Sequence, residues 1–390
     1  MPESKTARIR RVSYHKVFVP YRHVVEWSAG IRPGTTRLIA EVETEDGVTG
    51  WGETNCLWDF VEPLFANTLI PLVTGDDAFR IERILKRVEG AGFYHHKRAM
   101  VAAVAALEMA LWDIVGKYAG LPLYQLWGGT FRNEVPIVAY IQSNDPALLE
   151  QEAVAAVAAG FRTIKLKMGM SETADIDHVR LVREAVGPDI RLRGDVNGAW
   201  TIGTAKRQLR KLERFDLEYI EQPLPLEDLN GHAMLRRQTC IPIALDESAY
   251  TLQDVSAIIR ADAADVILLD AHEAGGLLPT RKAAAVCEAA GIPVTLHSGA
   301  ELGISTAANL HLATTIPNLI LAIDSQYPNQ TEDIITQPFD FTGGVMRVPQ
   351  GPGLGVTPDR DKLQRLATDR IQNAYLDPSR PDFFPMKPQY

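Results

Sequence analysis

The chain has 390 residues, of which 46% are hydrophobic and 23% charged, and this balance excludes disorder as its main state. The formal charge of −9 and the lack of dense Lys/Arg runs argue against a nucleic-acid surface, although local cations could bind a small anionic substrate. Three scattered cysteines indicate neither a disulfide framework nor a zinc site, and the sequence shows no signal peptide and no membrane-length apolar run. We therefore expect a cytoplasmic protein that acts without a membrane partner.

Residues 1–132 predict an α+β domain that caps a larger one. Residues 7–55 alternate apolar and polar side chains as strands do, in three segments: Arg8–Val19, Arg37–Val42 and Gly47–Glu53. Residues 60–126 show helical spacing instead, most clearly over Met100–Tyr118, where Ala, Leu and Met recur. We expect a small antiparallel sheet followed by helices.

From Val135 onward the pattern becomes strand, turn and helix. Eight apolar runs are continuous, as expected of parallel strands that are buried on both faces: Val135–Ile141, Thr163–Lys167, Ile190–Asp195, Glu218–Glu221, Pro242–Asp246, Asp265–Asp270, Pro293–His297 and Leu319–Asp324. Amphipathic stretches lie between them, such as Ala147–Ala159, which Asn144-Asp145-Pro146 opens as a helix cap. The pattern predicts a modified (β/α)-barrel over residues 133–334, and residues 335–390 would return to the capping domain.

Seven of these runs end in a charged or polar residue, at steps of 24 to 28 residues: Lys167, Asp195, Glu221, Asp246, Asp270, His297 and Asp324. Ionised side chains are seldom fully buried unless they are paired or bound to a metal, so their recurrence at the same end of successive strands carries information. A parallel barrel builds its active site from the C-terminal ends of its strands. The recurrence therefore predicts one active site that collects these seven side chains.

Three carboxylates from consecutive strands predict a metal site. Asp195, Glu221 and Asp246 would lie close together, and three such carboxylates cannot all stay ionised without a cation among them. All-oxygen ligation with room for substrate favours Mg²⁺, with Mn²⁺ as a substitute and Glu247 as a further ligand. The alternative is that these acids cap helices or pair with Arg193 and lysines, which is ordinary for one acid and unusual for three at equal spacing.

The flanking strands supply candidate bases. Lys165 and Lys167 lie two apart on one strand and share a face, on which clustered cations and the metal would lower the pKa of a lysine. Asp270 and His297 end neighbouring strands, where the carboxylate would fix the tautomer of the imidazole. A single histidine at a strand end is usually structural, but one beside an aspartate and across a barrel from two lysines predicts acid–base catalysis.

The order of these residues resembles the enolase superfamily. Lys-x-Lys is followed by Asp, Glu and Asp-Glu at successive strand ends, and the Asp270/His297 pair is similar to that of the mandelate racemase subgroup. Within this subgroup, three segments look most like glucarate dehydratases, which act on acid sugars: Gly194–Trp200, Leu296–Ser298 and Leu321–Tyr327. The resemblance implies proton abstraction next to a carboxylate, with a lysine or histidine base and Mg²⁺ stabilising the enediolate.

The same resemblance implies a hydro-lyase mechanism. Lys165 would neutralise the developing charge, Lys167 or His297 would take the α-proton, and His297 would protonate the departing β-hydroxyl to leave a 2-keto-3-deoxy acid. Asp324 would position the substrate carboxylate. Further substrate contacts would come from the barrel and from a capping loop: Asn197, Tyr140, Trp200, Arg22 and His23. The first three of these residues are equally consistent with packing, and a cationic cluster at residues 95–98 is equally consistent with a solvated surface.

Two positions depart from the glucarate dehydratase pattern, since Asp246 stands where those enzymes have Asn and Gln326 where they have His. Asp270 in turn stands where muconate-lactonizing enzymes and dipeptide epimerases have a second catalytic lysine. The alternatives are a racemase, epimerase or cycloisomerase that uses the same bases, and a metal-binding protein without activity. We expect a small anionic substrate, no nucleic-acid partner and a homo-oligomer.

Overall fold

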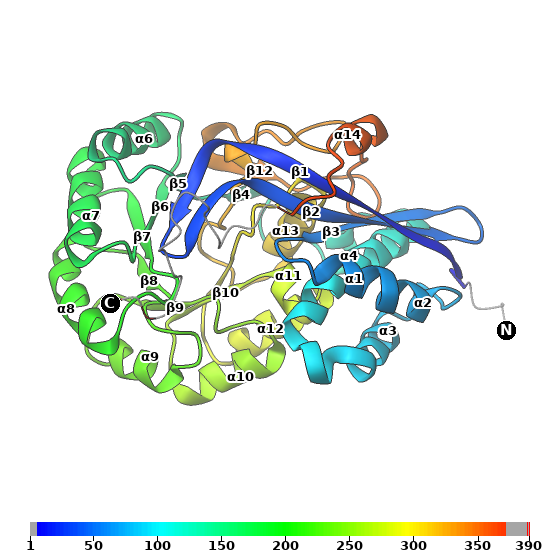
Figure 1. Ribbon diagram of the computed structural model, residues 1–390, viewed down its shortest axis with the longest axis horizontal. Coiled ribbons are helices and arrows are strands. Elements are labelled where there is room, and N and C mark those ends of the chain that lie inside the picture. Colours follow the sequence, from blue (N-terminus) through cyan, green and yellow to red (C-terminus); the bar gives the residue numbers. More distant parts are fainter. Residues whose placement is uncertain (1–5, 372–387, 389) are drawn as a thin grey trace.

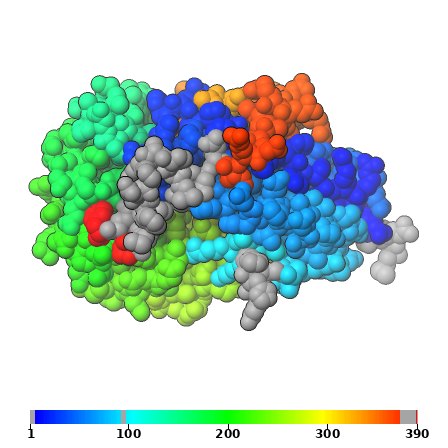
Figure 2. Space-filling model, viewed as in Figure 1, coloured from blue at the N-terminus to red at the C-terminus, as the bar shows by residue number. Residues whose placement is uncertain are grey.

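The structure is a computed structural model that describes residues 6–371, 388 and 390, apart from the side chains of residues 92–96. An N-terminal α+β part and a barrel lie side by side (Figure 1). In Figure 2 the blue and cyan N-terminal part lies against the green barrel, and the orange C-terminal segment lies against the blue N-terminal residues. The predicted fold class, a modified (β/α)-barrel with an α+β capping domain, is confirmed.

The capping domain is built on a three-stranded antiparallel sheet in the order β1-β2-β3. Its strands are longer than predicted, because the first two continue as a hairpin arm: Ile9–Trp27 (β1), Gly30–Thr44 (β2) and Thr49–Asn55 (β3). The helices that follow are Val61–Leu64 (α1), Ile70–Val73 (α2), Ile81–Val88 (α3), Tyr94–Ala119 (α4) and Leu123–Leu126 (α5).

Helix α4 packs closely against β3. Gly50 and Gly52 permit this approach, since a Cβ atom on Gly52 would lie 1.8 Å from the Ala106 carbonyl oxygen and one on Gly50 2.1 Å from that of Ala110. The stretch Lys97–Ala119 is long and apolar enough to cross a membrane, but its most apolar window is 78% buried inside the protein. Helix α4 is therefore the core helix of the capping domain.

Seven parallel strands form the barrel sheet in chain order: Ala139–Ile141 (β5), Thr163–Lys167 (β6), Arg191–Asp195 (β7), Tyr219–Glu221 (β8), Ile243–Leu245 (β9), Val266–Leu269 (β10) and Val294–Leu296 (β11). The helices between and after them are Pro146–Ala158 (α6), Glu172–Val186 (α7), Ile202–Leu212 (α8), Leu229–Arg236 (α9), Leu252–Ala261 (α10), Ala271–Ala274 (α11), Leu277–Ala289 (α12), Gly303–Thr315 (α13) and Arg360–Arg365 (α14). As predicted, Asp145 caps α6 by accepting a hydrogen bond from the Ala147 N–H group.

The predicted eighth strand, Leu319–Asp324, is not a regular strand. One of its residues bridges Val294 of β11 and another bridges Ile137 on the opposite side, so the segment changes partner before a continuous ladder can form. The Asp324 N–H group still donates to the Leu296 carbonyl oxygen at 2.9 Å. The segment thus closes the barrel and places Asp324 level with the other strand ends.

The C-terminal segment splits the predicted first barrel strand, Val135–Ile141. Its start, Glu134–Pro136 (β4), pairs antiparallel with Val345–Arg347 (β12), and only its end joins the barrel as β5. The segment then reaches the capping domain, where the Leu354 N–H group donates to Asp113 of α4 at 2.9 Å. The apolar core also continues from the barrel into the capping sheet as one cluster.

Candidate active site

A cavity of about 600 Å³ lies between the C-terminal ends of the barrel strands and the capping domain, a volume typical of small-molecule sites. The capping domain contributes a mainly apolar wall, which includes Tyr21, Val25, Trp27, Leu57, Trp58 and Phe60. The barrel contributes polar side chains, among them six of the predicted site residues: Tyr140, Lys167, Asn197, Asp246, Glu247 and His297.

Lys165 is fully buried beneath this cavity among three carboxylates. Its Nζ donates to both oxygens of Glu221 at 2.6 and 2.7 Å and to Asp324 Oδ2 at 2.5 Å, and lies 3.2 Å from Asp195 Oδ2. Burial alone lowers the pKa of Lys165, but Asp195, Asp324 and Glu221 raise it well above its usual value. The prediction of a lowered lysine pKa is therefore wrong for Lys165, because the carboxylates outweigh the neighbouring cation.

Lys167 follows Lys165 by two residues on β6 and meets a different environment. Its side chain is 14% exposed and lines the cavity, and its Nζ donates to Asp195 Oδ2 at 2.5 Å and to Asn197 Oδ1 at 3.2 Å. Asn197 in turn donates from Nδ2 to Glu247 Oε1 at 2.8 Å. Lys167 is thus the lysine of the pair with direct access to a bound substrate.

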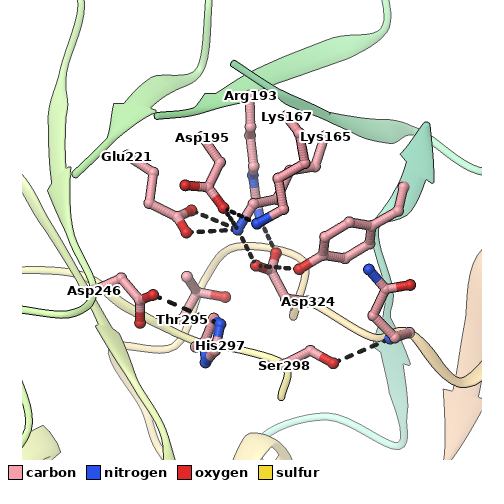
Figure 3. A network of polar contacts seen from close by, with 12 residues as sticks. Lys165, Lys167, Arg193, Asp195, Glu221, Asp246, Thr295, His297, Ser298 and Asp324 are labelled. Atoms are coloured by element: carbon pink, nitrogen blue, oxygen red, sulfur yellow. Dashed lines mark hydrogen bonds and ion pairs between the residues drawn. The ribbon is translucent and has the colours of Figure 1, made fainter. Parts of the chain in front are cut away.

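His297 faces the cavity from another strand end, on the side opposite the two lysines in Figure 3. Its Nδ1–H group donates to Asp270 Oδ2 at 2.9 Å, and its Nε2 lies 3.6 Å from Asp246 Oδ2. Burial lowers the pKa of His297, but Asp246, Asp270 and Glu273 raise it well above its usual value. The predicted pairing of Asp270 with His297 is present, with Nε2 as the ring nitrogen available to a substrate.

The predicted metal ligands lie at the ends of β7 to β9. Burial and the neighbouring Asp195 raise the pKa of Glu221 well above its usual value, and burial together with Glu247 raises that of Asp246 against the opposing effect of His297. Asp246 Oδ1 and Glu247 Oε2 are buried and have no hydrogen-bond partner among the described residues. Uncompensated carboxylate oxygens are the ligands that Mg²⁺ prefers, so Asp246 and Glu247 fit such a cation. The other two predicted ligands are engaged by lysines, since Glu221 accepts from Lys165 and Asp195 from Lys167.

A second set of side chains could hold a cation at the same place. Ligand atoms of Asp246, Glu273 and His297 lie within 4.8 Å of one another. Burial, followed by repulsion from Asp270, raises the pKa of Glu273 to about 8. Both sets contain Asp246; the first adds Asp195 and Glu221, whereas the second adds Glu273 and His297.

Asp324 lies below the cavity rather than in its wall. Its Oδ2 accepts from Lys165 and from the Tyr140 hydroxyl at 2.8 Å, and its Oδ1 lies 3.3 Å from Arg193 Nη1. Arg193 also donates to Glu218 at 2.6 Å and is fully buried. The geometry assigns Asp324 to holding Lys165 and Tyr140, and Asp324 does not line the cavity in which it was predicted to position the substrate carboxylate.

Three predicted substrate contacts lie outside the cavity. Trp200 is fully buried in the barrel core, where its Nε1–H group donates to Asp175 at 3.1 Å. Arg22 and His23 are exposed on β1, at an irregularity of the register between Pro20 and Val25, whereas Tyr21 and Val25 line the cavity. These three predictions are corrected: the Trp200 indole is buried in the barrel core, and the irregular part of β1 leaves the side chains of Arg22 and His23 exposed.

Several cavity residues were not predicted as site residues. Arg32 lies opposite Val25 in the β1–β2 hairpin and reaches the cavity, with its guanidinium 5.0 Å from the centre of the Trp27 ring. Glu273 lies three positions after Asp270, so inspection of the residues that follow each strand end could have found it. Of the cationic cluster, Arg98 lines the cavity, Lys97 pairs with Asp254, and the side chains of His95 and His96 lie outside those described.

Comparisons with known proteins agree with this architecture. Residues 148–362 match the family described as Enolase C-terminal domain-like, and residues 12–128 match the Mandelate racemase / muconate lactonizing enzyme, N-terminal domain. A protein of Streptomyces coelicolor named probable glucarate dehydratase is 35% identical over 370 residues, covering 85% of this chain and 84% of that protein. An N-succinyl-L-Arg/Lys racemase of Bacillus cereus is 29% identical over 368 residues, covering 92% and 98% respectively.

The solved structure of a muconate lactonizing enzyme from Pseudomonas fluorescens matches with a TM-score of 0.88 at 28% identity, over 93% of this chain and 100% of that chain. Relatives at 31–34% identity include an arabinonate dehydratase, a hydrophobic dipeptide epimerase and an o-succinylbenzoate synthase. The similarity therefore extends over several reactions within one family. The two domain matches, together with this arrangement of strand ends, place the chain in the enolase superfamily, with the N- and C-terminal domains of mandelate racemase and muconate lactonizing enzyme.

Proposed function

We propose that this enzyme is a hydro-lyase that removes water from an acid sugar to give a 2-keto-3-deoxy acid, with Mg²⁺ as cofactor. The observation that carries the proposal is that Lys167 and the Asp270-supported His297 line one cavity beside the Asp195, Glu221 and Asp246 carboxylates. Members of the superfamily abstract a proton next to a carboxylate and stabilise the resulting enediolate. Three of the similar proteins carry dehydratase names that refer to glucarate, arabinonate and xylonate.

The side chains divide the work according to their access to the cavity. Lys165, which three carboxylates keep charged, would stabilise negative charge that develops on the substrate carboxylate. Lys167 would take the α-proton, since its Nζ is the lysine nitrogen that reaches the cavity. His297 Nε2 would deliver a proton to the departing hydroxyl from the other side. Asp195, Glu221 and Asp246 would hold Mg²⁺, which supplies an electrophile for the substrate carboxylate.

The second candidate is a racemase or epimerase of a carboxylate. The specific observation in its favour is that both bases reach the same cavity, so each could serve one face of a substrate. A racemase and an epimerase are also among the similar proteins. The two-lysine reaction that the resemblance implies for dipeptide epimerases is disfavoured, because Asp270 occupies the position of the second lysine and is engaged by His297.

A screen of acid sugars with Mg²⁺ tests the proposal. The library would contain aldonates and aldarates, and keto-acid release would be followed with semicarbazide. We expect release from at least one compound by the purified chain and none by the Lys167→Ala, His297→Asn double variant. Exchange of the α-proton in D₂O without keto acid would replace the dehydratase by the racemase, and inertness toward every compound in both assays would contradict both candidates. Cytoplasmic location and a homo-oligomer stay predictions.

A further inference from the structure

A second histidine, His272, lies behind the Asp270–His297 pair and has no role in the proposed reaction. His272 is the second residue of the short helix α11, which follows β10. Its side chain is fully buried. Its Nδ1 lies 2.7 Å from Asp270 Oδ1, and its Nε2 lies 2.9 Å from Arg37 Nη2. The ring therefore joins the aspartate that supports His297 in the barrel to an arginine of the capping domain.

The direction of each hydrogen bond follows from the chemistry of the groups. A guanidinium has donors only, so His272 Nε2 accepts from Arg37 and the ring proton lies on Nδ1. The Ser305 hydroxyl lies 2.8 Å from the same Nε2 and is then a second donor to it. The Nδ1–H group then donates to Asp270 Oδ1, which also accepts from the His272 backbone N–H group at 2.7 Å. Two donors occupy Oδ1, which leaves Oδ2 for His297 Nδ1–H. The hydrogen bonds from His272 thus set the orientation of the Asp270 carboxylate, and this carboxylate in turn orients the His297 ring.

Arg37 is anchored from the capping domain. It lies on β2, is fully buried, and donates to Glu53 Oε1 of β3 at 2.7 Å and to the Gly299 carbonyl oxygen at 3.1 Å. Glu53 also accepts from the backbone N–H groups of Leu302 and Ser305 at 2.8 Å each. A buried polar network with its members paired in this way is rigid, so Arg37 presents a fixed donor to His272.

A cation at this place is not needed to explain the cluster. Ligand atoms of Asp270, His272 and Glu301 lie within 4.8 Å of one another. However, the proton on His272 Nδ1 and the two donors on Asp270 Oδ1 already account for these atoms. Glu301 accepts from Ser298 and from the Gly299 N–H group at 2.6 Å each, so its oxygens are engaged as well.

We propose that His272 is a positioning residue, which Arg37 of the capping domain holds in its Nδ1–H tautomer and which sets the orientation and tautomer of His297 through Asp270. The proposal rests on the acid–base role of His297 in the proposed function. Lys167 is held separately, by Asp195 and Asn197. Loss of His272 should therefore impair proton transfer at the His297 face of a substrate and spare the Lys167 face.

The tautomer can be measured without a substrate. In Mg²⁺-loaded protein labelled with ¹⁵N at histidine, two-bond ¹H–¹⁵N spectra distinguish an Nδ1–H ring from an Nε2–H ring. The His272 signals, identified by their absence in His272→Phe, should show a protonated Nδ1 and an unprotonated Nε2. An Nε2–H ring or an imidazolium at His272 would overturn the proposal, and this result does not depend on whether the proposed reaction is right.

Kinetics separate positioning from a general structural effect. D-gluconate and D-mannonate differ only in configuration at C2, so α-proton exchange of each in D₂O reports on one face of the site. His272→Phe should lower exchange at the His297 face by about 10–100-fold, the loss typical when the hydrogen-bond partner behind a functional histidine is removed. His272→Asn, whose amide can donate in place of Nδ1, should recover at least part of this loss.

His311→Phe is the matched control, since His311 is equally buried but bonds to the Leu354 carbonyl oxygen at 3.1 Å, away from Asp270. This variant should leave exchange at both faces unchanged. Equal losses at the two faces in His272→Phe, or no loss at either, would overturn the positioning role. Absence of exchange of both acids by the unmodified chain would count against the proposed function for these substrates, and the tautomer measurement would then decide the proposal alone.

Discussion

Lys165 and Lys167 share one face of β6, yet their surroundings give them different chemistry. Lys165 is enclosed by Glu221, Asp324 and Asp195, which raise its pKa well above its usual value. Lys167 reaches the cavity and lies next to Asn197. The difference arises from depth, because the first lysine of the pair lies one full repeat further into the barrel than the second. One short strand therefore carries one enclosed lysine and one lysine that reaches the cavity.

The two bases should act on opposite faces of a substrate. His297→Asn should remove exchange or elimination at one stereochemistry and Lys167→Ala at the other, because neither side chain can cross a bound substrate. Loss of a general acid or base typically lowers the rate by about 10²–10⁴-fold. Asp270→Asn should fall between the wild type and His297→Asn, because it disturbs the imidazole without deleting it. Steady-state kinetics and α-proton exchange in D₂O check this; near wild-type dehydration by His297→Asn would make the histidine structural.

Substitution can also identify the acids that hold the metal. Chelation of the metal should abolish turnover, and added Mg²⁺ should restore it. Mg²⁺ should also raise the unfolding temperature, because it binds the folded chain. We expect Glu221→Gln to lose this thermal shift and Glu273→Gln to retain it, since the strand-end carboxylates form the expected ligand set. The reverse pattern would assign the cation to Asp246, Glu273 and His297. Differential scanning calorimetry with and without Mg²⁺ is the measurement.

At the scale of elements, helix α12 begins against the capping domain rather than in solvent. Its first N–H groups, those of Leu277 and Leu278, donate to Glu108 of α4 at 2.6 and 2.9 Å, and Trp112 Nε1–H donates to the same carboxylate at 2.8 Å. Gly276 makes this contact possible, since a Cβ atom there would lie 2.3 Å from Glu108 Oε2. A side chain from one domain therefore caps a helix of the other, which ties the barrel to its cap.

This cap should make stability depend on pH. Burial raises the pKa of Glu108 from 4.5 to about 7, against the three donors, which lower it. Because the pKa is raised on folding, the contribution of Glu108 to stability is fully present below about pH 4.5 and is lost as the pH rises through about 7. A shift of this size corresponds to roughly 3 kcal/mol. Urea unfolding should thus give a smaller loss of stability between pH 5 and pH 8 for Glu108→Gln than for the wild type.

The control for this prediction is Glu150→Gln, because Glu150 lies exposed on α6. Its unfolding free energy should change with pH as in the wild type. A pH dependence of Glu108→Gln equal to that of the wild type would show that the buried carboxylate does not titrate in this interval.

At the scale of the whole molecule, the barrel core extends into the capping domain, which also encloses a second apolar cluster of its own. The barrel cluster includes Val17, Val19 and Ile39 of the capping sheet and Met109 of α4. Hydrogen bonds between Asp113 and Leu354 and between Glu53 and Ser305 also join the two parts. Interfaces of this kind couple the unfolding of their two sides, whereas polar and wet domain interfaces permit separate transitions.

We therefore expect the chain to unfold in a single cooperative step. Calorimetry of the Mg²⁺-loaded protein should show one peak, and far-ultraviolet circular dichroism and tryptophan fluorescence should follow the same midpoint. Resolved transitions for the capping domain and the barrel would contradict this. The cavity should then be lost together with the fold, since its apolar wall comes from the cap and its polar groups come from the barrel.

The sequence by itself determined the barrel, the capping sheet and the strand ends at which chemistry is found. Apolar runs of strand length at regular spacing bury their side chains best as parallel strands that are covered on both faces. The C-terminal ends of such strands lie together at one end of the barrel. For that reason Lys167, Asp195, Asp246 and His297 could be placed together without coordinates. The order of residue types along these strand ends also sufficed for the family.

Only the tertiary structure decided the hydrogen-bond partners and the burial of each of these side chains. Whether Lys165 is a base or a permanent charge depends on carboxylates that arrive from three other strand ends, and the role of His272 depends on Arg37, which is 235 positions away in the chain. Arg32 rather than Arg22 faces the cavity because of the register of the β1–β2 hairpin, and Trp200 is buried because the barrel core closes over it. Local periodicity specifies which face of an element is apolar, whereas side-chain partners and burial are set by contacts between distant segments, which no local pattern contains.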